Sequence, residues 1–370
     1  MGEWKTYRFG DLAELYSGGT PNKSRPEYWG GDIPWISAKT MYDDFLSTSE
    51  MCITETGLTN GSKLAKRGTI LLLTRGSGLF NRIPVCWARR DLSYNQDVKN
   101  IISKDESIVS NEFLYYWLYG HKKEISSILE TTGIGAGKID TERLCNLEVL
   151  LPAISVQTQI INAIKPIFDK IELNNRINHN LEEQALALYK SWFEDNTEYK
   201  NWPTTTLSAF FNVVTGKKDA NFSTPDGQYP FFTCSQAPLR APSYSFDGKA
   251  ILMAGNGDFN VKRYVGKFEA YQRTYVLMPF EEKYLSFLYL LMRVHLGDIT
   301  GGSRGSVIKF ITKGSIADYS FRFPSQSIDD KLDVLNSFYA QIDKHITEIE
   351  HLSSLRDLLI TKLIEDRFHC

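Results

Sequence analysis

Two long stretches, residues 156–195 and 328–367, constrain the fold of this 370-residue chain most. In each, apolar residues recur at alternating intervals of three and four, which is typical of the seam of a coiled coil. Moving the first seam forward by 171 residues places Ile164 on Leu335. Because neither helix can bury such a stripe alone, we expect the two helices to bury each other.

Two polar residues, Asn174 and Asn178, interrupt the first seam. Polar residues at seam positions cost stability, but they can fix which positions face each other. The sequence therefore predicts a single register for the helix pair.

The segments that precede the two helices repeat one plan. The apolar strand expected at residues 70–73 has a counterpart at 250–254, and glycine turns follow both. A helix expected over residues 111–129 has a counterpart around 287–292. Two copies of one unit, related by a local two-fold axis, would place their helices antiparallel. We therefore predict an α+β protein in which two mixed α/β domains each precede a long helix and the helices form an antiparallel coiled coil.

The predicted domain limits follow from this repeat. Residues 1–155 and 197–326 form the two globular domains, and residues 156–196 and 327–370 contain the long helices. Hydrophobic residues make up 42% of the chain, so a buried core is expected in each domain.

Charge is distributed unevenly along the chain. The net charge is −2, but residues 201–322 hold 14 Lys and Arg against 9 Asp and Glu. A local basic patch can bind phosphate groups on a protein that has no net positive charge. A phosphate-bearing partner is therefore compatible with the composition.

Cysteine usage and hydropathy indicate the compartment. The five cysteines are odd in number and show no close pairing, as expected of reduced thiols in a cytoplasmic protein. No apolar run reaches the length of a membrane-spanning helix, and the first residues do not resemble a signal peptide. We expect no membrane partner.

Several motifs together resemble one known family. Residues 17–21 with 33–36, the glycine-rich loop before Lys138, residues 151–157 at the start of a helix, and the ending 355–363 resemble the specificity subunit of type I restriction–modification enzymes. The resemblance implies two target-recognition domains that read a bipartite double-stranded DNA target. It also implies a non-catalytic scaffold that carries two modification (methyltransferase) subunits and recruits restriction subunits.

The motifs of an enzyme are largely missing from the sequence. A methyltransferase needs a cofactor glycine loop and an Asn/Asp-Pro-Pro-aromatic site, and the chain has neither. Residues 133–139 lack the residues of a nucleotide-binding phosphate loop, and no Cys/His cluster has zinc spacing. With the resemblance, this leads us to expect no cofactor in this chain and S-adenosylmethionine, ATP and Mg²⁺ on the partner subunits.

Two other hypotheses assign the chain to different classes of protein. Asp226 followed by Asp247 and Lys249 fits the loose pattern of a Mg²⁺-dependent DNA nuclease. Both aspartates, however, lie in ordinary turn signals, and the Asp-x-Lys segment is expected to precede the strand at 250–254 rather than lie in it. The third reading is a coiled-coil scaffold that binds only proteins.

Candidate DNA contacts are polar residues near glycine-rich turns, where the backbone can approach phosphate closely. Arg, Asn and Gln can make paired base contacts, whereas Lys mainly contacts phosphates. The candidates of the first domain are Ser17, Thr20, Lys39, Arg75, Ser77, Asn95, Gln96 and Lys138. Those of the second domain are Lys217, Lys218, Asn256, Lys262, Arg263, Gln272, Arg273 and Arg304.

Overall fold

The computed structural model describes residues 4–133, 135–302 and 309–365. The chain divides into two compact units, the first formed by Met1–Leu173 with Ile349–Cys370 and the second by Asn174–Glu348. The division passes through both long helices. Each unit therefore contains one globular part and a portion of each long helix.

The first unit is built on a five-stranded sheet with the order β2-β11-β7-β9-β4. All neighbours are antiparallel except β4 and β9. Strand β7 is fully buried, as the apolar run at 70–73 predicts. The strands are β2 (Ala13–Ser17), β11 (Val98–Ser103), β7 (Ile70–Leu73), β9 (Val85–Ala88) and β4 (Phe45–Leu46).

Smaller sheets complete this unit. Strand β1 (Lys5–Arg8) pairs with β14 (Glu148–Leu151), next to the start of the first long helix. A four-stranded sheet contains β5 (Cys52–Ile53), β3 (Trp29–Ile36), β10 (Leu92–Tyr94) and β6 (Lys63–Ala65). A three-stranded sheet contains β12 (Leu129–Thr131), β13 (Gly137–Ile139) and β8 (Arg75–Gly76).

The helix predicted over residues 111–129 is in fact two short helices. The Ser110 hydroxyl caps the first by accepting a hydrogen bond from the Phe113 amide at 3.2 Å. His121, with ψ near 21°, breaks the helix, and Leu129 already belongs to a strand. The short helices of the unit are α1 (Phe9–Leu12), α2 (Glu55–Gly61), α3 (Asn111–Gly120), α4 (Lys122–Ser127) and α5 (Thr141–Cys145).

The second unit has a six-stranded sheet with the order β16-β21-β19-β20-β17-β18. The strands are β16 (Phe211–Thr215), β21 (Thr274–Pro279), β19 (Phe246–Ala254), β20 (Val261–Ala270), β17 (Tyr229–Phe232) and β18 (Leu239–Ala241). A separate pair contains β15 (Thr204–Thr206) and β22 (Ser320–Arg322). The short helices are α7 (Leu285–Val294), α8 (Leu296–Thr300) and α9 (Lys313–Ala317).

The strand order confirms the predicted internal repeat. The series β2-β11-β7-β9 in the first unit corresponds to β16-β21-β19-β20 in the second. In each unit a two-stranded pair, β1 with β14 or β15 with β22, leads into a long helix. The loops between these elements differ in length, so the repeat lies in the topology rather than in a constant residue offset.

The long helices are α6 (Ile154–Tyr189) and α10 (Asp329–Ile360), and α6 continues through Pro166. In the first unit, Ile164 and Phe168 share a core with Ile360. In the second unit, Tyr189 shares a core with Leu332. In both units an early part of one helix therefore lies with a late part of the other, which is the antiparallel pairing that the sequence predicts.

The two seam asparagines pair across the helices in the second unit. The Asn174 side chain is fully buried and donates through Nδ2 to Glu348 Oε2 at 2.8 Å. Asn178 Oδ1 lies 2.8 Å from His345 Nδ1. Because a shift along the seam would bury these polar groups without partners, they favour one register.

Arginines attach each globular part to the long helix that follows it. Arg89, directly after β9, lies 2.6 Å from both Asp169 and Glu172 of α6. In the second unit, Arg263 on β20 lies 2.6 Å from Asp343 of α10. Glu172 and Asp343 are 171 residues apart, the same offset that relates the seams. The attachment is therefore part of the repeat.

None of the described helices is both long and apolar enough to cross a membrane.

A histidine contact in the second unit predicts a pH dependence of stability. His295 Nε2 lies 3.0 Å from Glu194 Oε1 in η4 (Lys190–Glu194), the π-helical turn that follows α6. The hydrogen bond to Glu194 raises the pKa of His295 above its ordinary 6.5. Burial acts to raise the pKa of Glu194, but the contacts with His295 help to outweigh it, so the pKa of Glu194 is lowered. A raised histidine pKa stabilises the fold fully below pH 6.5 and loses this contribution as pH rises through the folded value.

We therefore expect His295→Asn to lower the free energy of unfolding at pH 5.5 by more than at pH 9. Urea unfolding of both proteins at the two pH values measures the difference. An equal loss at both would show that the charged form of His295 contributes nothing.

Candidate nucleic-acid interface

Three loops that carry predicted contacts lie together at one end of the sheet in the second unit. The Gly216 amide donates to Thr274 O at 3.2 Å, the Gln272 amide to Lys218 O at 2.9 Å, and the Gly255 amide to Arg273 O at 2.8 Å. These backbone bonds join loops that are far apart in the sequence. We call the cluster formed by residues 216–219, 255–260 and 271–273 the second loop cluster.

This cluster is basic and exposed. Lys217, Gln272 and Arg273 are exposed, and Lys218 lies over the Phe222 ring at 4.4 Å. Lys309, which was not among the predicted contacts, is also exposed. It lies beside this cluster, since the Gly257 amide donates to its carbonyl at 2.9 Å. Among described residues, none of the cations of this cluster forms an ion pair with a carboxylate.

Glycine is required where the loops of this cluster meet. A Cβ atom on Gly216 would lie 1.9 Å from Ala270 O, and one on Gly255 would lie 2.5 Å from Arg273 O. No larger residue fits at either position without moving the backbone. The glycines therefore allow the close approach that brings the basic side chains together.

Two predicted contacts brace the cluster. Asn256 Oδ1 accepts from Cys234 Sγ at 2.8 Å, and Lys262 Nζ donates to Asn260 Oδ1. Burial lowers the pKa of Lys262 below its ordinary value. These side chains help to hold the loop from 255 to 260 in place.

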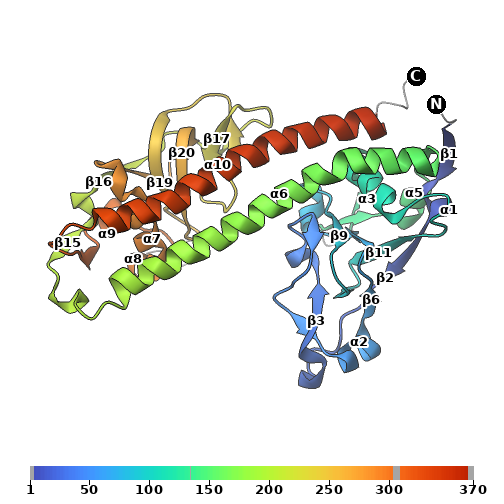
Figure 1. The fold of residues 1–370 in the computed structure, drawn as a ribbon, viewed down its shortest axis with the longest axis horizontal. Helices are drawn as coiled ribbons and strands as arrows, with labels where there is room; N and C mark the ends of the chain where they lie inside the picture. Colours follow the sequence, from blue (N-terminus) through green and yellow to red (C-terminus); the bar gives the residue numbers. More distant parts are fainter. Residues whose placement is uncertain (1–3, 134, 303–308, 366–370) are drawn as a thin grey trace. The chain divides into compact units, whose positions relative to one another are not determined.

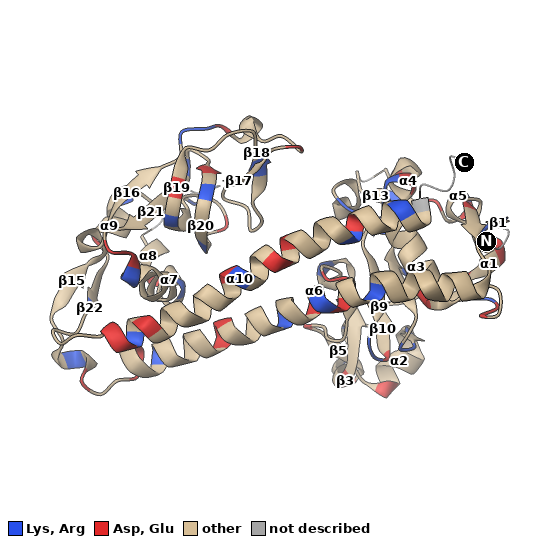
Figure 2. Ribbon diagram, turned by 45° about the horizontal axis from the view of Figure 1, so that its top comes forward, with Lys and Arg blue, Asp and Glu red and all other residues tan. Residues whose placement is uncertain are grey.

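Arg263 faces the opposite side of the sheet. Successive side chains of a strand point to opposite faces, so Lys262 and Arg263 cannot serve the same surface. The Arg263 side chain is only 10% exposed, is bound to Asp343, and lies 5.1 Å from the centre of the Tyr339 ring. Arg263 therefore packs against α10 and does not belong to the second loop cluster. Figure 2 shows Lys and Arg residues of β19 and β20 in blue.

The first unit brings some of its predicted contacts together as well. Thr20 Oγ1 donates to Gln96 Oε1 at 2.7 Å, and Gln96 is exposed. Arg75 on β8 lies directly opposite Lys138 on β13. Ser17 accepts a hydrogen bond from Lys99, which sequence reasoning missed. We call this group the first loop cluster.

The remaining candidates of the first unit have different surroundings. Asn95 is 6% exposed, and its side chain bonds both the amide and the carboxylate of Asp97, so it holds a turn. Lys39 and Ser77 are exposed. Arg304 of the second domain lies outside the described residues.

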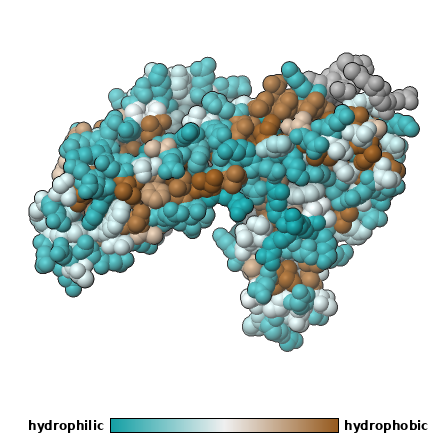
Figure 3. Space-filling view, in the orientation of Figure 1, coloured by the Kyte–Doolittle hydropathy of each residue, from teal (hydrophilic) through white to brown (hydrophobic). Residues whose placement is uncertain are grey.

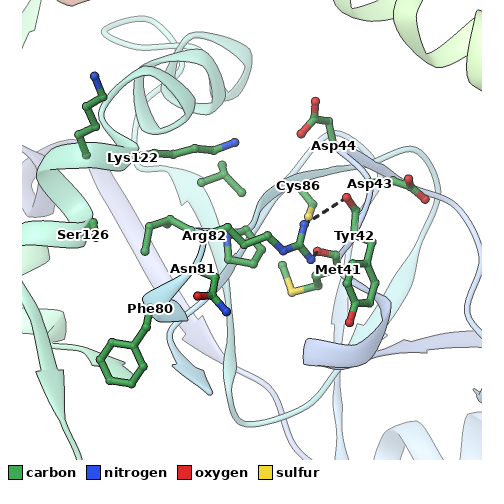
Figure 4. A pocket seen from close by; sticks show the side chains of 14 residues that line it. Met41, Tyr42, Asp43, Asp44, Phe80, Asn81, Arg82, Cys86, Lys122 and Ser126 are labelled. Carbon is green, nitrogen blue, oxygen red and sulfur yellow. Dashed lines mark hydrogen bonds between the residues drawn. The ribbon is translucent and has the colours of Figure 1, made fainter. Parts of the chain in front are cut away.

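A cavity of about 280 Å³ in the first unit lies elsewhere, between α4 and the loops at residues 41–44 and 80–86. Figure 4 shows Arg82 directed toward the 41–43 loop, where it donates to the carbonyls of Met41 and Tyr42. Burial lowers the pKa of Lys122 to about 8. Asp44, also in the lining, accepts from Tyr119 at 3.3 Å. These charged groups already have partners within the fold.

The three residues of the nuclease reading occupy different settings. Asp226 lies in a turn closed by the Gly227 amide and Thr224 O at 3.1 Å. Asp247 and Lys249 lie within β19, which begins at Phe246, so the expectation that they precede the strand is wrong. Lys249 is paired with Glu282 at 2.7 Å. In the described ranges no three His, Cys, Asp or Glu side chains are grouped closely enough to hold a metal ion.

A comparison with known families decides the relationship. The profile described as "Type I restriction modification DNA specificity domain" matches the chain twice, over residues 1–183 and 199–352. The chain belongs to this family. The two matches correspond to the two repeats of the fold, which confirms the resemblance seen in the motifs.

Individual relatives agree with this assignment. The EcoDI specificity subunit of Escherichia coli is 44% identical over 159 residues, which are 42% of this chain and 35% of that protein. The MjaIX specificity subunit of Methanocaldococcus jannaschii is 26% identical over an alignment of 412 positions, covering 98% of this chain and 93% of that protein. The chain thus matches about a third of the first relative and nearly all of the second.

A solved structure shares the fold. The type I restriction–modification S subunit from M. genitalium superposes with a TM-score of 0.61 at 15% identity, covering 98% of this chain and 96% of that one. At this identity the likeness concerns the fold alone. It supports the arrangement of two mixed sheets and two long helices.

The neighbours Lys262 and Arg263 provide a matched pair for a stability test. Arg263→Met would leave Asp343 without its cation, so we expect the free energy of unfolding to fall by about 2 kcal/mol. Lys262→Met removes a cation from the other face and one hydrogen bond to Asn260, so it should lower the free energy of unfolding by only about 1 kcal/mol. Urea unfolding measures both. Equal losses would contradict the assignment of Arg263 as the attachment to α10.

Proposed function

We propose that the chain is the DNA-binding specificity subunit of a type I restriction–modification complex. The observation that carries this proposal is the double match of the specificity-domain family, one match on each repeat. Each repeat presents a loop cluster with exposed cations that form no ion pair with another described residue. In this function each cluster reads one half of a bipartite double-stranded DNA target, and the bases between the halves are not read.

The partners follow from the same family. We infer that the chain carries two modification subunits and recruits restriction subunits. Apolar side chains reach the surface along the long helices (Figure 3), and those of α10 offer a surface for such subunits. The large exposed apolar residues among those described in α10 are Val334, Ile346, Leu355 and Leu358.

The chemistry belongs to these partners in this proposal. S-adenosylmethionine, ATP and Mg²⁺ would bind to the modification and restriction subunits, and the complex would act in the cytoplasm. The chain itself supplies orientation, since its polar loops are suited to contact DNA rather than to transfer a group. The nuclease reading has no support from the separate settings of Asp226, Asp247 and Lys249.

The first test uses the purified chain with its modification subunit. We expect it to bind one bipartite duplex in preference to a scrambled one, and the chain alone to leave DNA uncut in Mg²⁺. Binding of proteins without DNA preference would favour the scaffold reading. Mg²⁺-dependent cutting by the chain alone would favour the nuclease.

The repeat predicts that the half-sites are independent. Replacing residues 201–322 with the corresponding segment of another specificity subunit should change one half-site of the methylated sequence and leave the other intact. Mapping methylated positions in cells that carry the chimera and the modification subunit measures this. Changes in both halves would contradict independent reading.

Gln96 provides a test of base recognition in the first loop cluster. A glutamine amide can pair with adenine in the major groove, and loss of such a contact costs about 1–3 kcal/mol of discrimination. Gln96→Ala should therefore relax sequence choice at one position of one half-site. Gln184→Ala, at an exposed position of α6, is the matched control and should leave the methylated sequence unchanged. An unaltered sequence in both variants would remove Gln96 from the readers.

A further inference from the structure

Four cations of the first unit lie close together, and none of them forms an ion pair with a described carboxylate. Lys99 on β11 lies between Ser17 of β2 and Leu72 of β7 and donates to the Ser17 hydroxyl. Arg75 and Lys138 face each other across β8 and β13. Lys63 on β6 lies 5.8 Å from the centre of the Tyr16 ring.

Their charges act on one another. The pKa of Lys99 is lowered by burial and, next, by the positive charges of Lys63 and Arg75. Residues directly opposite on antiparallel strands have side chains on the same face, so like charges at Arg75 and Lys138 repel. The burial of Lys99 and the repulsion between these like charges both destabilise the protein when no ligand is bound. An anion bound between the side chains would attract each of them and so offset this cost.

Some other basic residues of this unit are neutralised by carboxylates. Arg25 pairs with Glu27, Lys66 with Asp91, Lys165 with Glu112, and Arg89 with two carboxylates of α6. For Lys63, Arg75, Lys99 and Lys138, by contrast, the described part of the chain provides no ion pair. The four cations of the cluster therefore differ from these paired residues.

Glu130 on β12 lies directly opposite Lys138, but the described residues show no ion pair between them. Two further carboxylates near the cluster have other partners. Glu14 accepts a hydrogen bond from the Tyr16 hydroxyl. Asp140 caps α5 by accepting from the Arg143 amide at 2.9 Å, although Lys138 also contributes to lowering the pKa of Asp140. Neither carboxylate forms an ion pair with a cation of the cluster. The cluster keeps a positive excess.

We propose that Lys63, Arg75, Lys99 and Lys138 form a site for the phosphodiester backbone of double-stranded DNA, and that they position the duplex without reading its sequence. This inference rests on the proposed function. Arg75 and Lys138 lie on neighbouring strands, which are roughly 5 Å apart. Lys63 and Arg75 are near enough to Lys99 to lower its pKa, so the four cations can contact phosphate oxygens of one DNA strand. The Thr20–Gln96 pair, beyond the ends of β2 and β11, is left to contact bases.

Replacing these cations with glutamine tests whether they contact phosphates while other residues contact bases. The experiment uses the full chain with its modification subunit and measures the dissociation constant for target and scrambled duplexes over a range of salt concentrations. Lys63→Gln, Arg75→Gln and Lys99→Gln should each lower the magnitude of the salt slope by about one unit. They should weaken both duplexes by the same factor, so that the preference for the target is unchanged.

Lys66→Gln is the matched control. Lys66 is three residues from Lys63 and exposed, but it is paired with Asp91 at 2.8 Å. Its loss should leave the salt slope and both affinities unchanged. Lys99→Arg keeps the charge and should keep the slope, and Lys63→Gln and Arg75→Gln affect exposed residues, so the test does not depend on how well Lys99→Gln folds.

Two outcomes would overturn the inference and leave the proposed function intact. In the first, wild type prefers its target and the variants keep the wild-type slope. In the second, the variants lose the target preference, which would make these residues base readers. If wild type itself binds no duplex, the proposed function fails together with the inference.

A free nucleotide has the same phosphate chemistry as the DNA backbone. ATP added at matched ionic strength should therefore leave wild-type DNA binding unchanged. Competition by micromolar ATP that disappears in the Arg75→Gln and Lys99→Gln variants would assign the cluster to a nucleotide and overturn the assignment to DNA.

Discussion

The structure depends on the mutual burial of two amphipathic helices. Neither α6 nor α10 has an apolar stripe that its own globular part fully covers, and each unit uses portions of both helices in its core. Removal of apolar surface from water stabilises the helix pair, but this effect is not directional and does not fix the register along the seam. The hydrogen bond from the buried Asn174 to Glu348 favours one register, because a shifted pair would lose this bond and keep the desolvation cost of Asn174.

The long-range regularities of this fold could be predicted from the sequence, because each is a pattern that extends over many residues. The seam spacing and the doubled order of domain and helix both survive local variation, and both were confirmed. Limits of short elements were less predictable. The helix expected over residues 111–129 ends at Gly120, where His121 leaves helical geometry, and β19 begins four residues before the apolar run at 250–254. Tertiary pairing of strands overrode the local pattern at Leu129, which pairs with Ile139, and at residues 246–249 of β19.

The candidate interface was predicted by residue type and only partly by position. Lys262 and Arg263 are equally basic and adjacent, yet the pleat of β20 sends one toward the loops and the other to Asp343. No local signal in the sequence distinguishes them without the strand register. Lys63 and Lys99 were missed because they lie on strands rather than on glycine turns. Their relevance follows from contacts with residues far away in the sequence, such as Lys99 with Ser17.

The sharing of α10 by both units has a consequence for how the chain acquires its structure during synthesis. The core of the first unit includes Ile360, although most of that unit precedes residue 174. On a ribosome, the apolar stripe of α6 would emerge well before the residues that cover it. Exposed apolar surface of this kind promotes aggregation while folding is incomplete. Between the synthesis of α6 and that of α10, a chaperone or an early-bound subunit would therefore protect the nascent chain.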